Sequence, residues 1–327
     1  MAHRVLVTGT RGKSGMVRLL DAALGACGVR CWSRVTGVVP TVRTPEGLFR
    51  IRRTAPASVA EMRWWLASLP RNAEAVVLEN SAVAPELHPL AGRWLRPTLT
   101  VWTNAHPDHQ EVWGWRSEDA LRVLLGGVPP GVPVVLGRDL AELPELRREL
   151  ERRGCPVFSP PGSGSEDIPS CQRAVALAAC GAMELDRERC LEGMASLPPD
   201  EGDFRPFPFP GGGVLASAFA ANEPTSSEVL FASLAWSREE TVLWYHHRRD
   251  RSGRLEAFLP WFRQGWREIW LTGALPWRSV AGARVLGNPP PEEMGRLLGE
   301  GRRVFGCGNV AGLPLALLEI LEGGPGR

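Results

Sequence analysis

The most constraining feature of this chain is a short apolar run that passes directly into a glycine-rich turn. Val5–Val7 precede the run Gly9-Thr10-Arg11-Gly12-Lys13-Ser14, and a helical pattern continues to about Cys27. A strand, a glycine turn and a helix in this order surround a phosphate group with backbone N–H groups and a helix N-terminus. The run therefore predicts a phosphate-binding loop in an α/β fold, although Val7 stands where the full Walker pattern has glycine.

The same turn contains the only lysine of the sequence. Of the 38 lysine and arginine residues, Lys13 is the single lysine and the other 37 are arginine. An ammonium group is a compact point charge that fits between phosphate oxygens, whereas a guanidinium group is a planar fork. We therefore expect Lys13 to bind the β and γ phosphates of a nucleotide, with the Ser14 hydroxyl on Mg²⁺.

Further apolar runs alternate with helical patterns along the chain, as is typical of βαβ units around a mostly parallel sheet. The composition predicts a nucleotide-binding domain over 1–205, a Pro/Gly-rich linker over 206–213 and a smaller, Rossmann-like α/β domain over 214–327. In the first domain we expect strands at 75–78, 98–102 and 132–136, a helix near 139–153 and a helix from a Ser170 cap to Met183. In the second we expect strands at 214–219, 241–245, 268–271 and 303–305, with helices near 225–235, 255–265, 290–300 and 312–322.

Polar residues follow two of these strands at their ends. Glu79 follows the strand at 75–78, and Asn104 and His109 follow the strand at 98–102. The carboxyl ends of parallel strands meet at one edge of a sheet, so these residues are expected beside the phosphate loop. Glu79 offers the oxygen ligand that Mg²⁺ prefers, and His109 is a candidate ligand of a second ion, with Asp108 orienting its ring. Taken singly, Glu79 also fits a helix cap or an ion pair, and His109 a solvent-facing loop.

Composition limits the remaining function classes. A net charge of +2 argues against a nucleic-acid partner bound through bulk charge. The seven cysteines lack paired C-x-x-C spacing, which favours reduced intracellular thiols, and no apolar run approaches the roughly 18 residues of a membrane span. We expect a cytoplasmic protein that reaches a membrane only through a partner subunit. The thirteen tryptophans are expected to pack in the core or at a partner interface rather than to form a binding platform.

Taken together, the motifs resemble the ordered signature of the Mur ligase superfamily of ATP-dependent amide ligases. In the first domain the similarity lies in Thr8–Ser14, Glu79-Asn80-Ser81 and Thr103-Asn104 with Asp108-His109. The ligase subunits of poly-γ-glutamate (capsule) synthase are more similar still. That narrower resemblance lies in Gly193-Met194, 199–202, 219–226 with Asn222-Glu223-Pro224, Arg248-x-Asp250-Arg251-x-x-Arg254 and Gly308-Asn309-x-x-Gly312.

The resemblance implies an ADP-forming ligase that activates a glutamate carboxylate as an acyl phosphate and then forms a γ-linked amide. It implies ATP and Mg²⁺ or Mn²⁺ as cofactors and glutamate or poly-γ-glutamate as substrate, and it leaves a membrane partner subunit and a homo-oligomer open. The implied catalytic residues are Lys13, Glu79 and His109, and the implied metal ligands are Ser14, Glu79 and His109. The implied nucleotide-binding residues are Gly9, Thr10, Arg11, Gly12, Lys13, Ser14, Asn104, Gln172 and Arg205, and the implied substrate-binding residues are Asn222, Arg248, Asp250 and Arg251.

Three positions depart from the superfamily pattern. Its members usually place a carbamylated lysine after the histidine motif, and this chain has no second lysine. Either His109 acts with carboxylates such as Asp108 or Glu111, or the second metal is absent. Gly15 replaces the usual Thr or Ser, and Gln172 stands where an Asn often contacts adenine. Two alternatives stay open: an ATP-binding assembly or regulatory subunit without ligation, and a P-loop kinase of a small carboxylate metabolite.

Overall fold

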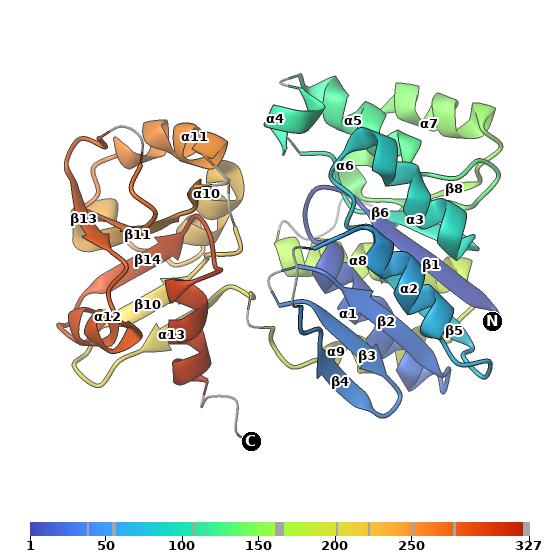
Figure 1. Ribbon diagram of the computed structural model, residues 1–327, viewed down its shortest axis with the longest axis horizontal. Helices are drawn as coiled ribbons and strands as arrows, with labels where there is room; N and C mark the ends of the chain where they lie inside the picture. The colour runs from blue at the N-terminus through green and yellow to red at the C-terminus, as the bar shows by residue number, and fades with distance from the viewer. Residues whose placement is uncertain are drawn as a thin grey trace. The chain divides into compact units, whose positions relative to one another are not determined.

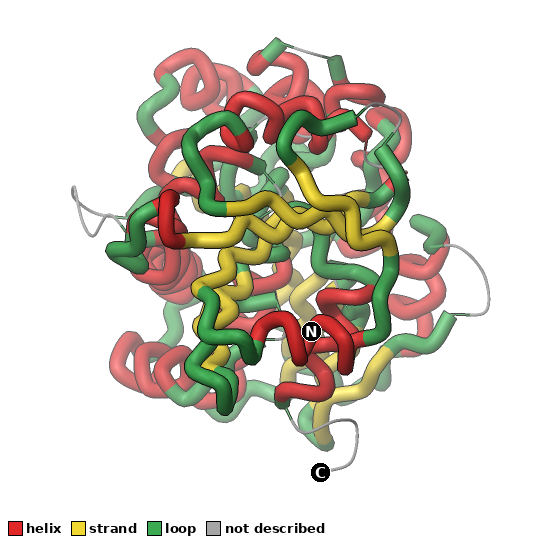
Figure 2. The backbone as a smooth tube through the Cα atoms, turned by 90° about the vertical axis from the view of Figure 1, so that its left-hand side faces the viewer, coloured by secondary structure: helices red, strands yellow, loops and turns green. Residues whose placement is uncertain are grey.

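The chain divides into two compact units, Met1–Pro198 and Pro199–Arg327 (Figure 1). The computed structural model describes residues 1–37, 39–53, 57–106, 109–114, 116–160, 167–200, 202–221, 223–249, 252–276 and 279–322. Figure 2 distinguishes the helices, strands and loops of the chain, and each unit contains both helices and strands. Every helix within these ranges is too short or too polar to cross a bilayer.

Unit 1 is built on one sheet, in which the described strands follow the order β4-β3-β2-β5-β1-β6-β7-β8. The neighbours from β2 to β8 pair in parallel, and the β3–β4 hairpin adds an antiparallel edge. The strands are β1 (His3–Thr8), β2 (Cys31–Val35), β3 (Thr41–Thr44), β4 (Gly47–Arg50), β5 (Ala75–Glu79), β6 (Leu99–Trp102), β7 (Val134–Leu136) and β8 (Val157–Phe158). The helices are α1 (Lys13–Ala26), α2 (Ala60–Ser68), η1 (Pro85–Leu87), α3 (His88–Leu95), α4 (Gln110–Trp113), α5 (Ser117–Gly126), α6 (Arg138–Ala141), α7 (Pro144–Arg152), α8 (Ile168–Ala182) and α9 (Arg187–Ala195).

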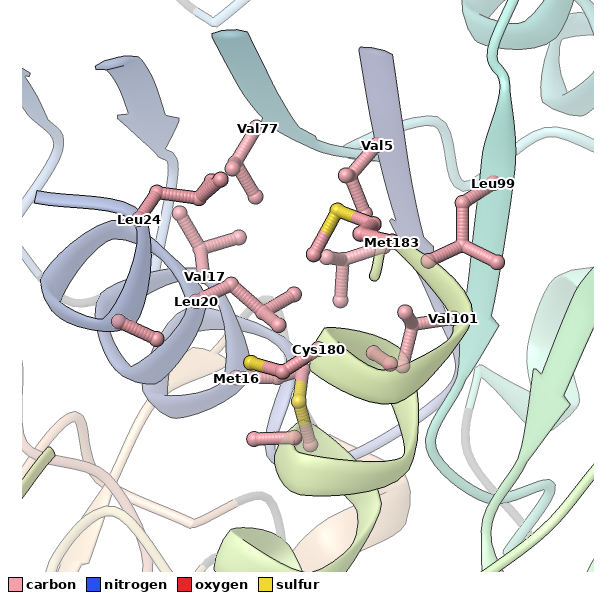
Figure 3. Close-up of a cluster of buried hydrophobic side chains, with 14 of the residues drawn as sticks. Val5, Met16, Val17, Leu20, Leu24, Val77, Leu99, Val101, Cys180 and Met183 are labelled. Carbon is pink, nitrogen blue, oxygen red and sulfur yellow. The ribbon is translucent and has the colours of Figure 1, made fainter. Parts of the chain in front are cut away.

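Both faces of this sheet are buried because successive strand residues point to opposite sides. Val5 and Val77 pack with α1 and α8 side chains such as Leu20 (Figure 3). Leu6 and Leu78 join the α2 and α3 side chains on the other face. The helices therefore cover both faces, which leaves the carboxyl edge of the parallel strands to the loops that carry polar residues.

Unit 2 holds a second sheet, in which the described strands follow the order β13-β12-β11-β14-β10-β9. All neighbouring pairs are parallel except β9 with β10. The strands are β9 (Arg205–Pro208), β10 (Val214–Ser217), β11 (Thr241–His247), β12 (Glu268–Gly273), β13 (Ala283–Gly287) and β14 (Arg303–Cys307). The helices are α10 (Pro224–Ala232), η2 (Arg238–Glu240), α11 (Ser252–Phe262), α12 (Pro291–Leu298) and α13 (Leu313–Leu321).

The expected α/β class is confirmed, and several local predictions are corrected. The α8 helix is capped by Asp167, whose carboxylate accepts a hydrogen bond from the Ser170 N–H at 2.7 Å, and not by Ser170. The helix expected near 139–153 is divided into α6 and α7, with Pro144 at the start of α7. Strand β9 lies partly within the expected linker, where its prolines are tolerated because β9 is the last strand of the described sheet.

Candidate active site

The loop between β1 and α1 has the backbone shape of a phosphate-binding loop. Gly9 has φ 132°, and a Cβ atom there would lie 2.1 Å from the Thr103 Oγ1 atom. Gly12 caps α1 with φ 71°, in the left-handed region that favours glycine. The Lys13 Nζ atom donates to the carbonyl oxygens of Gly9 at 2.7 Å and Thr10 at 3.1 Å. The ammonium group therefore lies over its own loop.

The end of β6 braces this loop through Asn104. The Asn104 Oδ1 atom accepts hydrogen bonds from the Thr10 hydroxyl at 2.6 Å and the Arg11 N–H at 3.0 Å. Its Nδ2 atom donates to the Arg11 carbonyl oxygen at 3.1 Å, and the Thr103 hydroxyl donates to the same oxygen at 2.6 Å. Asn104 thus holds the loop in shape with both ends of its carboxamide.

Glu79, at the end of β5, contacts the same loop. Its side chain is only 4% exposed, and its Oε2 atom accepts a hydrogen bond from the Ser14 hydroxyl at 3.1 Å. The backbone N–H of Thr36, which follows β2, donates to the same oxygen at 2.8 Å. The carboxyl ends of β1, β5 and β6 therefore bring Ser14, Glu79 and Asn104 to one loop, as the strand order predicts.

His109 is held by its backbone and by an aromatic neighbour. Its φ is 50°, an uncommon value for a residue with a side chain, and its carbonyl oxygen accepts hydrogen bonds from the N–H groups of Val112 and Trp113, both at 2.8 Å. The ring centres of His109 and Trp113 lie 5.2 Å apart. The Trp113 indole N–H donates to the Val83 carbonyl oxygen at 2.6 Å, which fixes the indole against which His109 packs.

A second histidine, His88, is buried and also packs against Trp113. Its ring centre is 5.9 Å from that of Trp113, in an edge-to-face arrangement. The Asn80 Nδ2 atom lies 3.1 Å from both the Nδ1 atom and the carbonyl oxygen of His88, an arrangement that assigns the proton of the neutral ring to Nε2. Burial, and then the positive charges of Lys13 and His109, lower the pKa of His88 to about 4. This neutral imidazole lies within the electrostatic reach of both catalytic candidates.

In unit 2, hydrogen bonds connect two of the motifs that carry the resemblance, one ending at Arg254 and the other containing Asn309. The Arg254 Nη1 atom donates to the Asn309 Oδ1 atom at 2.5 Å, and the Asn309 Nδ2 atom donates to the His246 carbonyl oxygen at 3.0 Å. These contacts connect α11 and the loop after β14 to the end of β11. Glu223 caps α10 by accepting from the Ser226 N–H at 3.0 Å.

The predicted nucleotide and substrate residues of unit 2 are only partly described. Arg205 forms an ion pair with Glu322, and its guanidinium lies 4.8 Å from the centre of the Phe207 ring. Arg248 is half-buried directly after β11. Asn222, Asp250 and Arg251, like Asp108 of unit 1, lie outside the described residues. The roles expected for all of these residues stay predictions.

Comparison with known families accounts for most of the chain. Residues 7–165 match the Mur ligase middle domain, and residues 208–324 match the poly-gamma-glutamate synthase CapB C-terminal domain. The chain belongs to the Mur ligase superfamily. It is accordingly an ATP-dependent ligase that forms carbon–nitrogen bonds.

Curated relatives agree with this family, and a solved structure shares the fold. This Mur ligase is 24% identical over 276 residues to the PGA synthase CapB of Bacillus subtilis (strain 168), covering 78% of this chain and 70% of the relative. It is 23% identical over 356 residues to the capsule biosynthesis protein CapB of Bacillus anthracis, covering 97% and 76%. A bifunctional folylpolyglutamate synthase/dihydrofolate synthase, solved with Mn, AMPPNP and L-glutamate bound, shares the fold with a TM-score of 0.65 at 19% identity, covering 97% of this chain and 88% of that one.

The residues of this Mur ligase fit one divalent ion at the phosphate loop. The Ser14 hydroxyl and the Glu79 carboxylate are hard oxygen donors that already lie within 3.1 Å of each other. Elsewhere the donors are sparser: in the described ranges, no three His, Cys, Asp or Glu side chains gather closely enough to hold a metal. His109, a predicted ligand of a second ion, lies within the described ranges, and its role as a ligand stays a prediction.

Sequence reasoning missed the residues that support the site. Asn80 belongs to the Glu79-Asn80-Ser81 motif, but the sequence does not predict its hydrogen bonds to His88, and His88 belongs to no motif. Trp113 was expected to pack in the core or at a partner interface, and it is buried, yet it also contacts His109. Gln172 lies against Gly12 and Gly15 of the phosphate loop and the first turn of α1.

Proposed function

We propose that this Mur ligase extends γ-linked glutamate chains by joining the amine of an incoming amino acid to a glutamate carboxylate at the expense of ATP. The observation that carries the proposal is the 3.1 Å contact between Ser14 and Glu79 at a loop that also holds Lys13. The match of residues 208–324 to the poly-gamma-glutamate synthase C-terminal domain supports glutamate as the substrate.

The reaction we propose has two steps. A carboxylate oxygen of the substrate attacks the γ phosphorus of ATP, the bond from that phosphorus to the bridging oxygen breaks, and ADP leaves. The amine nitrogen then attacks the carbonyl carbon of the acyl phosphate and loses a proton. Inorganic phosphate leaves with the bonding electrons, and an amide remains.

The residues of the chain would neutralise and position charge in these steps. Lys13 would swing from its loop carbonyls to the β and γ phosphate oxygens, and the loop N–H groups would hold the phosphates. Ser14 and Glu79 would hold a Mg²⁺ or Mn²⁺ ion, which supplies Lewis-acid stabilisation of phosphate charge. His109 would lie near the reacting carboxyl group, and Arg248 and Arg251 would bind glutamate carboxylates through paired hydrogen bonds.

Oxygen labelling tests the proposal directly. The purified protein is incubated with ATP, Mg²⁺ or Mn²⁺ and glutamate whose carboxylates carry ¹⁸O, and ADP, the amide product and phosphate are analysed by mass spectrometry. The proposal predicts a new glutamyl amide and one ¹⁸O atom in the released phosphate. ADP with only a phosphorylated product would identify a kinase, and tight ATP binding without turnover would identify an assembly subunit.

Two substitutions at position 13 sharpen this test. Lys13→Ala removes the charge, and Lys13→Arg keeps the charge but replaces the compact ammonium by a fork. We expect both variants to lose turnover, since the loop encloses the ammonium closely. Normal turnover in either variant would show that the loop is not the site of phosphoryl transfer.

A further inference from the structure

Gln172 occupies space that two glycines of the phosphate-loop region leave open. A Cβ atom on Gly15, in the first turn of α1, would lie 3.0 Å from the Gln172 Oε1 atom. A Cβ atom on Gly12 would lie 2.8 Å from the Gln172 Nε2 atom. The carboxamide, carried by α8, therefore spans both glycines, and a side chain at position 15 would push it away.

The Gln172 carboxamide makes no hydrogen bond with any described residue. Its position thus results from packing against the two glycines and not from a polar partner in this part of the chain. A half-buried amide with unused donors and an unused acceptor, held beside a phosphate loop, is free to bond a ligand there.

We infer that Gly15 and Gln172 act as one unit, in which Gly15 provides the space that seats the Gln172 carboxamide against a bound adenine nucleotide. Gln172 is then a nucleotide-binding residue, and Gly15 is a positioning residue that acts through it. The nucleotide part of this inference rests on the proposed function, whereas the packing part does not. This unit explains the departures from the superfamily pattern at Gly15 and Gln172 together.

A double-mutant cycle tests the unit. Nucleotide affinity is measured by titration with Mg²⁺ and AMPPNP for the wild type, Gly15→Ala, Gln172→Ala and the double variant. Losing one hydrogen bond to the nucleotide should weaken binding about three- to tenfold in each single variant. The double variant should bind no more weakly than Gln172→Ala. The inference would be overturned if the loss of AMPPNP affinity in the double variant equalled the product of the two single losses. It would also be overturned if Gly15→Ala bound AMPPNP with wild-type affinity.

A conservative replacement gives a second arm. Gln172→Asn shortens the side chain by one methylene, so its amide leaves room for a Cβ atom at position 15. Gly15→Ala combined with Gln172→Asn should therefore bind AMPPNP more tightly than Gly15→Ala alone. An equal or weaker affinity would count against the proposed seating.

Thermal unfolding separates packing from nucleotide binding. Alanine is a better helix former than glycine, so Gly15→Ala should raise Tm by about 2–4 °C when Gln172 is Ala and by less when Gln172 is present. Gly25 is a matched control, because it lies in the same helix and a Cβ atom there meets nothing within 4 Å. Gly25→Ala should raise Tm equally in both backgrounds and leave AMPPNP affinity unchanged. If Gly15→Ala raised Tm equally with Gln172 present and in the Gln172→Ala background, the proposed packing of Gln172 against Gly15 would be refuted. If the wild type binds no nucleotide but the Tm coupling holds, the proposed function fails and the packing stands.

Discussion

Replacing Trp113 is expected to weaken metal binding through His109 as well as to destabilise unit 1. Trp113→Leu removes two ring contacts, to His109 and His88, each worth about 0.5–1.5 kcal/mol. It also removes the 2.6 Å hydrogen bond to the Val83 carbonyl oxygen, worth about 1 kcal/mol. The free energy of unfolding of unit 1 should therefore fall by about 2–4 kcal/mol. Trp113→Phe keeps the rings in contact and should cost about 1 kcal/mol.

The effect on metal binding follows from the backbone of His109. Its φ of 50° is costly for a residue with a side chain and is expected to relax once the indole no longer packs against its ring. Losing a ring contact of about 0.5–1.5 kcal/mol should raise the half-saturating Mn²⁺ concentration about two- to tenfold. The change should be smaller in Trp113→Phe, which retains an aromatic ring.

The assay is a Mn²⁺ titration in the presence of AMPPNP, followed by electron paramagnetic resonance, beside urea unfolding of each variant. Leu124→Ala is the matched control, because Leu124 is fully buried in the same cluster and its truncation should cost about 2–5 kcal/mol. We expect Leu124→Ala to destabilise unit 1 without changing the half-saturating Mn²⁺ concentration. If it raises that concentration as much as Trp113→Leu does, or if Trp113→Leu leaves it unchanged, the indole does not position His109.

Three further predictions concern stability and chemistry. The Tyr245 hydroxyl is buried without a hydrogen-bond partner among the described residues, so Tyr245→Phe should stabilise unit 2 by about 1 kcal/mol in urea unfolding, and a loss of stability would contradict this. Burial is the main cause that lowers the pKa values of His88 and His246 from 6.5 to about 4. Between pH 6.5 and about 4 the unfolded chain therefore binds protons at these histidines that the folded chain does not. The free energy of unfolding has its full value above pH 6.5 and should fall by up to about 3 kcal/mol per histidine as the pH approaches 4. The pH dependence of unfolding should be shallower in His246→Gln, and an unchanged slope would refute the assignment. Because Lys13 is the only lysine, the ligase should work without bicarbonate, and turnover that stops when carbon dioxide is removed would show carbamylation after all.

The meeting of Ser14, Glu79 and Asn104 could be predicted because it depends on topology. Each lies at or shortly after the end of a buried, mainly apolar strand, and parallel neighbours bring their carboxyl ends to one edge. Strand β2 could not be found in this way. It contains Arg34, which is 2% exposed and is buried by an ion pair with Glu61 of α2 at 2.7 Å. The partner that makes such burial tolerable is distant in sequence, so the strand pattern is hidden.

The supporting residues of the site were hidden for a related reason. His88 belongs to no motif in the sequence, and its importance arises only when α3 places it beside Asn80 and Trp113. Likewise, the cap of α8 depended on which of two polar residues, Asp167 or Ser170, supplied the acceptor. Local sequence offers both, and the backbone path into the helix decides between them.

The departures from the superfamily pattern differ in how this chain compensates for them. Gly15 and Gln172 face each other, so one change makes room for the other. The missing second lysine has no such counterpart, because in the described ranges no three acidic, histidine or cysteine side chains replace a carbamate. A second ion bound through His109 would depend on a neutral ligand whose position is fixed by its left-handed backbone and by Trp113. Rigid placement of one ligand lowers the entropy lost on binding, so we propose it as the physical means by which this chain would offset a missing negative charge.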